Sequence, residues 1–531
     1  MSLLAGLVYP INSLPAARLS GRGIDVLCHD ADAKLDAVAR YYEQVDADLL
    51  FFFSDIVIQA EALGASLAYS PAGMPRVAAK TAIPAGPART SARMEVNAAV
   101  TSGLKRAFPS KPVAGMVYGP FTVAGQAMGE EALMRACLTS PEEARAAVAK
   151  ALEGALGYAR LLLDAGADVL WVSDPFAGLL PPALFGQFAG DPLARLFDAH
   201  PDVPNAVHIC GDIGQLLANV LDTGVQAVSF DQVMDLLAVE DAMPAGRIII
   251  GNMDPLAVAD AQSAGALAQE VDALAQTMGT HPAFSLSTGC ALPPSTPVEN
   301  AAAFVDAGHA AMRAVAPGAS LLYGLSASVE AGDLESAAGI VDVCLCSGFD
   351  PLLVLGGGLM RAVRKQSALY EARKSHLADI LLMTDALNAG MKRLSPHLPK
   401  TSDAVRMVLG TAAGDHHAIG KDVVGAVLEA QGIKVLDLGV DAGADAFAKA
   451  LAETGAPLAG ISAFTSQARA ALRAMVPAIR EKAGRPVGIL VGGAATSQGF
   501  AAEIGADAFA KDAAAAARVV KSLLEKFPGR D

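Results

Sequence analysis

Short apolar runs alternate with longer stretches of helical periodicity along roughly the first 325 residues of the chain. The apolar runs predict buried strands at 48–56, 113–121, 169–175, 206–212, 227–231, 248–254 and 284–290. The stretches between them predict helices, most clearly at 141–165, where Ser140 can serve as the N-cap, and at 258–278. Strands that alternate with helices over this length predict a parallel sheet closed into a (β/α)8 barrel, whose first strand the pattern does not locate.

The pattern changes near residue 328, where predicted strands give way to helices alone. Helical periodicity predicts a small bundle built from 333–347, 351–366, 368–374 and 376–394. From residue 404 the alternation returns, with predicted strands at 405–410, 433–438, 459–464, 487–491 and 506–510 and a last helix at 513–526. This part predicts a flavodoxin-like, doubly wound parallel sheet. We therefore expect an α/β protein with domains at 1–327, 328–400 and 401–531.

Composition and charge exclude several classes of protein function. The chain is 53% hydrophobic, yet it lacks an uninterrupted apolar run long enough to predict a membrane span. A net charge of −15, without a lysine or arginine cluster, argues against nucleic acid as a partner. The first residues lack the basic region of a signal peptide, so we expect a cytoplasmic protein that binds no membrane. The six cysteines are too few in 531 residues to be a disulfide framework; they are Cys28, Cys137, Cys210, Cys290, Cys344 and Cys346.

Each predicted barrel strand ends in a residue that can do chemistry. These residues are Asp55, Tyr118, Asp174, His208 with Cys210, Asp231, Asn252 and Cys290. The active site of a barrel is built from the carboxyl ends of its strands, so we expect these side chains at one mouth.

Two of these residues, His208 and Cys210, stand two apart on one predicted strand and therefore face the same side. Cys290 ends a later strand and would meet them at the barrel mouth. Three soft ligands with a vacant fourth position are typical of a catalytic zinc site, which can hold a thiol as its thiolate. The alternative is that the two cysteines are ordinary core residues.

The short sequence motifs around these residues resemble those of the uroporphyrinogen decarboxylase superfamily, in its branch of zinc-dependent corrinoid methyltransferases. They are Tyr118-Gly119-Pro120-Phe121-Thr122, Ser173-Asp174-Pro175, His208-Ile209-Cys210-Gly211, Gly251-Asn252-Met253-Asp254-Pro255 and Gly289-Cys290. That branch includes methylcobamide:coenzyme M and chloromethane methyltransferases, and the resemblance implies zinc held by His208, Cys210 and Cys290. Asp174 could orient the site, bind zinc transiently or cap the following loop. Asp55 and Asp231 could orient the ligands. Tyr118 could bind substrate or simply pack.

A second motif, Asp415-x-His417-x-x-Gly420, lies between a predicted strand and a predicted helix. It resembles the signature of cobalamin-binding domains of the methionine synthase type. The resemblance implies that His417 is the lower ligand of cobalt, that Asp415 bonds its other ring nitrogen, and that Gly420 admits the nucleotide tail. Ser462 and the pair Gly492-Gly493 match the family's later motifs around that tail.

Two departures from the cobalamin-binding family concern the histidine. Phe464 stands where the family has leucine, and the family's relay serine is not evident over 465–468. The helical segment 333–398 resembles the cap that covers the upper face of the corrin in the same proteins.

Together the resemblances imply a fused zinc- and corrinoid-dependent methyltransferase of one-carbon metabolism. It would move a methyl group between a small substrate and the cobalt of its own corrinoid. The substrate would be a methyl donor, such as a methyl halide or methylated thiol, or a zinc-activated thiol acceptor; the direction stays open. A second methyltransferase or a reductive-activation protein would be a further partner. The alternatives are a corrinoid carrier or sensor with an inactive barrel, and a porphyrinogen decarboxylase. The decarboxylase needs an arginine-rich opening, where this chain has only Arg18 and Arg22.

Overall fold

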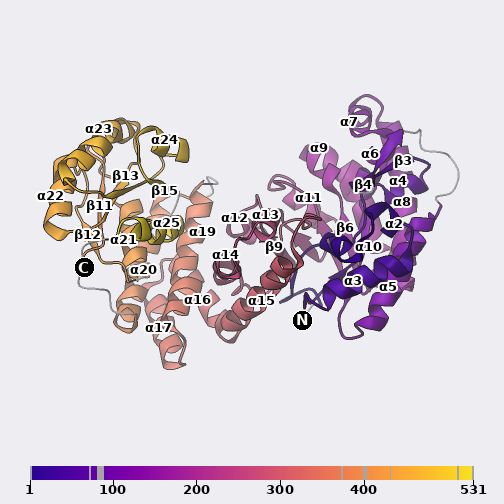
Figure 1. The fold of residues 1–531 in the computed structure, drawn as a ribbon, viewed down its shortest axis with the longest axis horizontal. Helices are drawn as coiled ribbons and strands as arrows, with labels where there is room; N and C mark the ends of the chain where they lie inside the picture. The colour runs from indigo at the N-terminus through magenta and orange to yellow at the C-terminus, as the bar shows by residue number, and fades with distance from the viewer. Residues whose placement is uncertain are drawn as a thin grey trace. The chain divides into compact units, whose positions relative to one another are not determined.

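The structure is a computed structural model that describes residues 3–528 apart from 71–72, 80–88, 245, 372–374, 399–403, 431 and 511–512. The chain divides into two compact units, Met1–Tyr323 and Gly324–Asp531. Figure 1 colours the first unit from indigo to magenta and the second from there to yellow. None of the helices in the described ranges is long and apolar enough to cross a membrane.

The first unit is built on eight parallel strands in the order β1-β10-β9-β8-β7-β6-β5-β2, which confirms the predicted barrel. The strands are β1 (Val8–Tyr9), β2 (Leu50–Phe51), β5 (Val113–Tyr118), β6 (Val169–Ser173), β7 (Asn205–His208), β8 (Ala227–Ser229), β9 (Ile248–Met253) and β10 (Phe284–Thr288). The predicted strand at 48–56 is wrong in length, because only two of its residues pair with a neighbour.

The join between β1 and β2, which we call the seam, depends on one side chain. The backbone N–H of Asp48 donates to the Val8 carbonyl at 3.0 Å, and the Val8 N–H donates to the Asp48 carboxylate at 2.8 Å. His309 Nε2 lies 2.9 Å from the same carboxylate. A carboxylate therefore takes the place of a backbone carbonyl where the barrel closes.

Helices surround the barrel strands (Figure 1). The longer ones are α3 (Ala31–Tyr42), α5 (Ala92–Ala107), α6 (Pro120–Met128), α7 (Glu130–Thr139), α8 (Pro141–Asp164), α10 (Asp191–Asp198), α14 (Ala264–Met278) and α15 (Val298–Val315). The shorter ones are α1 (Ala17–Ser20), α2 (Ile24–Leu27), α4 (Ile58–Ala62), α9 (Pro182–Phe185), α11 (Leu217–Asp222), α12 (Leu236–Glu240) and α13 (Pro255–Ala259).

Two features of this unit differ from the prediction. The single helix predicted at 258–278 is wrong, because α13 ends at Ala259 and α14 starts again after Ser263, whose hydroxyl accepts the N–H of Ala266 at 3.2 Å. The antiparallel hairpin of β3 (Ser66–Ser70) and β4 (Gly73–Ala79) was not predicted.

The second unit begins within α16 (Ala319–Glu330) and continues as a run of helices. They are α17 (Leu334–Cys346), α18 (Pro351–Val354), α19 (Met360–Glu371) and α20 (Leu377–Leu394). A π-helical segment, Leu355–Leu359, interrupts the helix predicted at 351–366, over three successive glycines. The helix predicted at 368–374 is the end of α19, and its residues 372–374 lie outside the described residues.

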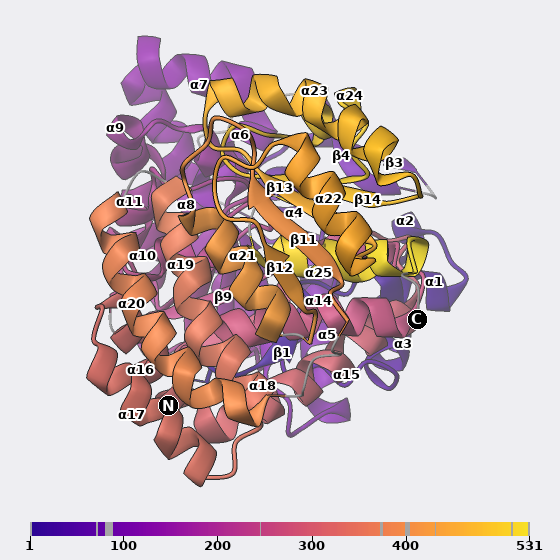
Figure 2. The same ribbon diagram turned by 90° about the vertical axis from the view of Figure 1, so that its left-hand side faces the viewer.

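The rest of this unit is a five-stranded parallel sheet in the order β12-β11-β13-β14-β15, which confirms the flavodoxin-like prediction. The strands are β11 (Met407–Thr411), β12 (Val435–Asp437), β13 (Leu458–Ser462), β14 (Gly488–Gly492) and β15 (Ala508–Ala510). The helices are α21 (Ile419–Ala430), α22 (Ala444–Thr454), α23 (Ser466–Ala483), α24 (Gln498–Glu503) and α25 (Ala513–Lys526). Figure 2 shows the sheet with α21 and α22 beside it.

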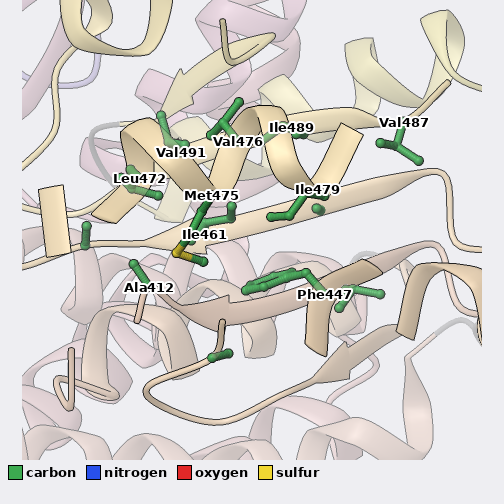
Figure 3. Packing of buried hydrophobic residues seen from close by; sticks show 14 of the residues in the cluster. Ala412, Phe447, Ile461, Leu472, Met475, Val476, Ile479, Val487, Ile489 and Val491 are labelled. Carbon is green, nitrogen blue, oxygen red and sulfur yellow. The ribbon is translucent and has the colours of Figure 1, made fainter. Parts of the chain in front are cut away.

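The helices form two layers, since α21 packs against α25 and α22 packs against α23. Figure 3 shows the core under α22 and α23, where Phe447, Leu472 and Ile479 meet the strand residues Ile461 and Ile489. This packing fixes the carboxyl ends of β11, β13 and β14 at one edge of the sheet.

Candidate functional site

The structure brings His208, Cys210 and Cys290 together at the carboxyl ends of β7 and β10. Their candidate ligand atoms all lie within 4.8 Å of one another, and His208 Nε2 is 3.4 Å from Cys210 Sγ. Among the described residues, this is the one group of three or more His, Cys, Asp and Glu side chains that could hold a metal ion. His208 is buried and the two cysteines are half-buried, so the group is enclosed yet reachable.

The ionisation of this cluster suits a soft divalent cation. Hydrogen bonds from Cys210 and then His208 lower the pKa of Cys290 to about 4, against the opposing effect of burial. The same bond to Cys290, followed by burial, raises the pKa of Cys210. These hydrogen bonds therefore favour the thiolate form of Cys290 over that of Cys210. Thiolate sulfur and imidazole nitrogen are the donors that zinc prefers.

His208 is oriented by Ser229, a residue that the sequence reasoning missed. His208 Nδ1 lies 3.1 Å from Ser229 Oγ at the end of β8, which leaves Nε2 on the side of the cysteines. A hydrogen bond at the distal nitrogen is the usual way in which a protein fixes a histidine ligand. The signal was present in the sequence, because Ser229 lies within the predicted strand 227–231, which follows the predicted strand that carries His208.

Asp231 fixes the loop that follows Cys210. One carboxylate oxygen accepts the N–H of Gly211 at 2.9 Å, and the other accepts the N–H of Val233 at 3.1 Å. Asn252 in turn donates to the backbone carbonyl of Asp231 at 3.0 Å. These contacts are those of a residue that positions the cysteine loop.

Asp174 is fully buried against the start of α6. Its Oδ1 accepts hydrogen bonds from the N–H of Thr122 at 2.9 Å and from the Thr122 hydroxyl at 2.5 Å. A Cβ at position 119 would lie 2.1 Å from Oδ2, so only glycine fits there. Burial raises the pKa of Asp174 to about 6. Of the three interpretations of Asp174, the cap of a neighbouring loop is the one that these contacts favour.

The side chains of Asp55 and Tyr118 both contact other groups of the protein. Asp55 forms a buried ion pair with Arg93 at 2.5 Å, and Arg93 also binds Glu61 at 2.8 Å. The Tyr118 hydroxyl lies 3.4 Å from the Ser54 carbonyl in a buried position. For Tyr118 the geometry favours packing over substrate binding.

The second site centres on Asp415 and His417, which follow β11. His417 Nδ1 lies 2.7 Å from Asp415 Oδ1, and the same oxygen accepts the His417 backbone N–H at 3.1 Å. Burial raises the pKa of Asp415, but hydrogen bonds from Phe464 and His417 outweigh it and leave the pKa below its usual value. Asp415 is buried while the His417 side chain is 53% exposed. This leaves Nε2 of an oriented imidazole for a metal.

Phe464 completes this arrangement, and the sequence marked it only as a departure. Its backbone N–H donates to Asp415 Oδ2 at 2.5 Å. Its ring stacks on the His417 imidazole, with the centroids 4.5 Å apart and the planes at 30°. A backbone amide thus satisfies the second carboxylate oxygen of Asp415.

The glycines at this edge of the sheet differ in whether a larger side chain would clash with the protein. A Cβ at Gly493, where φ is +98°, would lie 2.5 Å from the Ala463 carbonyl oxygen, and one at Gly492 would lie 2.9 Å from that of Ala510. At Gly420 a Cβ would meet no protein atom within 4 Å. Protein packing therefore demands Gly492 and Gly493, while Gly420 leaves open space beside the histidine loop. Ser462 ends β13 in register with Gly492.

Comparison with known proteins matches a family model to each of the two units. Residues 13–311 match the uroporphyrinogen decarboxylase (URO-D) family, and residues 405–520 match the B12 binding domain. The uroporphyrinogen decarboxylase of Sphingopyxis alaskensis is 29% identical over 300 residues, 53% of this chain and 86% of that protein. Corrinoid protein DSY3155 of Desulfitobacterium hafniense (strain Y51) is 31% identical over 213 residues, 39% of this chain and 99% of that protein.

A solved methyltransferase from Methanosarcina mazei shares the barrel fold. The TM-score is 0.52 at 19% sequence identity, and the match covers 57% of this chain and 92% of the other. The family match covers more than half of the chain, and the carboxyl-terminal relative is matched over nearly its whole length. The chain belongs to the uroporphyrinogen decarboxylase family and carries after its barrel a B12-binding domain of the corrinoid-protein kind.

Proposed function

We propose that the protein is a zinc- and corrinoid-dependent methyltransferase that moves a methyl group between a small substrate and the cobalt of its own corrinoid. The observation that carries the proposal is the cluster of His208, Cys210 and Cys290 at a barrel mouth. It lies in a chain that also presents an Asp415-oriented histidine in a B12-binding domain. A porphyrinogen decarboxylase would need neither feature.

Each site supplies one half of the reaction. His208, Cys210 and Cys290 would hold zinc with a fourth position free for the sulfur of a thiol or a methylated thiol. Zinc bound there would lower the pKa of a thiol and keep it as the nucleophile. The corrinoid, when bound, supplies a cobalt centre that can accept or give up a methyl group. Asp415 and Phe464 would keep His417 aimed at that cobalt.

The experiment uses the full-length chain reconstituted with cobalamin. Bound zinc is measured by mass spectrometry, and the reduced protein is offered methyl halides, methylated thiols and free thiols in turn. The visible spectrum of the corrinoid reports any transfer to or from cobalt. We expect about one zinc per chain and a spectral change with a sulfur substrate.

Cys290→Ala is the decisive variant, and Cys137→Ala is its control, because Cys137 is a buried cysteine of α7 outside the cluster. We expect Cys290→Ala to lose zinc and transfer while it keeps its corrinoid. A wild-type protein that binds corrinoid, contains no zinc and reacts with no substrate would instead be a corrinoid carrier or sensor. A zinc-free protein that decarboxylates a porphyrinogen would overturn the proposal.

The contacts of the opening arginines speak against the decarboxylase. Arg18 donates to the Ser295 carbonyl, and Arg22 pairs with Asp30 at 3.0 Å. Each guanidinium group therefore has a partner among the protein's own oxygens.

A further inference from the structure

The direction of the His417 side chain depends on the loop that carries it. This histidine loop, residues 412–418, joins β11 to α21 and belongs to neither element. The imidazole is about half exposed, and it contacts the Asp415 carboxylate and the Phe464 ring. Its direction therefore follows the backbone that carries Asp415.

A second loop holds the histidine loop from the side. Residues 438–443 join β12 to α22, and β12 pairs with β11 (Figure 2). In this second loop the Asp441 carboxylate accepts the Gly414 N–H at 2.6 Å, and the Asp441 N–H donates to the Asp415 carbonyl at 2.9 Å. One residue thus bonds the histidine loop both directly before Asp415 and at Asp415 itself.

Thr411, the last residue of β11, completes the arrangement. Its buried hydroxyl donates to the Asp415 carbonyl at 2.5 Å and accepts the Asp441 N–H at 2.9 Å. The Asp415 N–H donates to the Ala412 carbonyl at 3.0 Å, and its carboxylate binds His417 and the Phe464 N–H. Every polar group of Asp415 therefore has a partner, which restricts this residue to one orientation.

The backbone of Asp441 adopts a conformation that residues with a side chain seldom adopt. Among the described residues it is one of two non-glycine residues with a positive φ, which is +55°. Its side chain is exposed, so packing in the core does not impose this conformation. Such a conformation persists where the surrounding contacts require it. Within the described part of the chain, the hydrogen bonds of Asp441 all go to Thr411, Gly414 and Asp415.

A further contact joins the second loop to the helix that follows His417. Lys421, in the first turn of α21, is buried and forms an ion pair with Asp437, the last residue of β12, at 2.5 Å. The other carboxylate oxygen of Asp437 accepts the Gly439 N–H at 2.9 Å. The start of the second loop is thereby fixed to α21, so Asp441 contacts the histidine loop from a fixed position.

We propose that Asp441 is a positioning residue for the lower ligand of cobalt. It fixes the backbone at Gly414 and Asp415, and through Asp415 it sets the direction in which His417 presents Nε2. This inference rests on the proposed function, in which His417 binds the cobalt of the corrinoid. A histidine on a loop without this support would spend only a fraction of its time in the direction that binds, and its apparent affinity for cobalt would fall by that fraction.

The test uses the full-length chain reconstituted with cobalamin and reduced to the cobalt(II) form. Electron paramagnetic resonance detects the nitrogen below cobalt by its splitting of the spectrum. Protein labelled with nitrogen-15 changes this splitting from a triplet to a doublet where the nitrogen belongs to the protein. The label therefore distinguishes His417 from the cofactor's own base, and the doublet measures the fraction of cobalt that carries histidine.

The decisive variant is Asp441→Gly, which keeps a residue suited to the positive φ and removes the carboxylate. We expect the equilibrium constant for placing histidine on cobalt to fall about tenfold. Asp441→Asn keeps an acceptor oxygen and also tolerates a positive φ. Its equilibrium constant should lie between those of the wild type and Asp441→Gly.

Asp507→Gly is the matched control for a general loss of stability. The Asp507 carboxylate also accepts a backbone N–H, that of Ile489 at 2.7 Å, but it does so where β14 and β15 begin, at the opposite edge of the sheet. We expect Asp507→Gly to lower the midpoint of urea unfolding and to keep the wild-type doublet.

The outcomes separate this inference from the proposed function. A wild-type doublet in Asp441→Gly, or an equal loss of the doublet in Asp507→Gly, would overturn the role of Asp441. Either result can occur while methyl transfer proceeds, so it would leave the proposed function standing. A wild-type chain whose cobalt carries no protein nitrogen would also overturn the role of Asp441, and a chain that binds no cobalamin would overturn the proposed function with it.

Discussion

The imidazole of His417 lies stacked on the ring of Phe464, and one carboxylate, that of Asp415, bonds both residues. The ring is thus held from its edge by a hydrogen bond and from its face by an aromatic contact. A lower ligand of cobalt has to present one nitrogen in one direction, and this pair of contacts restricts the directions that are open to it.

Replacing Phe464 tests that restriction. Phe464→Leu removes the stack, which is worth about 0.5–1.5 kcal/mol for an aromatic pair, so the equilibrium constant for placing histidine on cobalt should fall several-fold and the histidine-bound fraction of cobalamin with it. The visible spectrum of the bound cofactor measures that fraction. Phe464→Tyr keeps the stack and should restore the wild-type spectrum. A leucine variant with an unchanged spectrum would show that the stack plays no part in ligation.

Removing the charge of Asp415 should weaken the binding of the cofactor. In Asp415→Asn the histidine loses a carboxylate partner, and losses of such partners cost about 10–100-fold in metal affinity. Equilibrium binding of cobalamin to the chain measures the effect. Asp445→Asn, on the exposed face of α22 where Asp445 binds Lys482, is the control and should bind as the wild type does. Equal affinities of the two variants would contradict the assignment of His417 as a ligand.

The glycines Gly420 and Gly493 should respond in opposite ways to alanine. Gly493→Ala puts a Cβ 2.5 Å from a backbone oxygen, so it should destabilise the B12-binding domain in urea unfolding. Gly420→Ala meets no protein atom and should leave the unfolding curve unchanged. If the nucleotide tail passes beside Gly420, the same substitution should weaken cobalamin binding. Gly499→Ala, also free of neighbours within 4 Å, is the control for both measurements.

The buried carboxyl of Asp174 should make stability depend on pH. Its pKa is about 6 in the folded protein against 3.8 in the unfolded chain, so the folded state binds one more proton between these values. Stability should therefore fall by about 3 kcal/mol as the pH rises through that window, and stay level above it. The measurement compares urea unfolding of the barrel in the wild type and in Asp174→Asn near pH 4 and near pH 7. A difference between the two proteins that does not change with pH would refute the raised pKa.

The positions of most strands could be predicted from the apolar runs in the sequence, because a strand that is buried on both faces needs an unbroken apolar segment. The barrel strands β5 to β10 and the five strands of the second sheet all lie within four residues of their predicted bounds. The first strand could not be found, since Val8–Tyr9 is too short to show any period. The break between α13 and α14 was not predicted, because the helical pattern of apolar residues continues on both sides of Ser263. The Ser263 side chain caps a new helix there instead of continuing the first one.

The sequence predicted those parts of the two sites that are formed by side chains. It did not predict the contacts that are made by backbone groups. His208, Cys210 and Cys290 could be grouped from strand ends alone, as could Asp415 and His417 from their spacing. The amide of Phe464, which takes the second oxygen of Asp415, leaves no mark in a sequence. The inward direction of Tyr9 could not be anticipated, because it depends on locating β1.

The pairing of β1 with β10 also sets the order in which parts of the barrel become available during synthesis of the chain. Strand β1 pairs with β10, so the first strand has no sheet partner there until residues 284–288 have been made. At about 5–20 residues per second this leaves the barrel open for some tens of seconds of synthesis. Cys290 leaves the ribosome directly after β10. The last strand of the barrel and the third member of the His208–Cys210–Cys290 group therefore become available together.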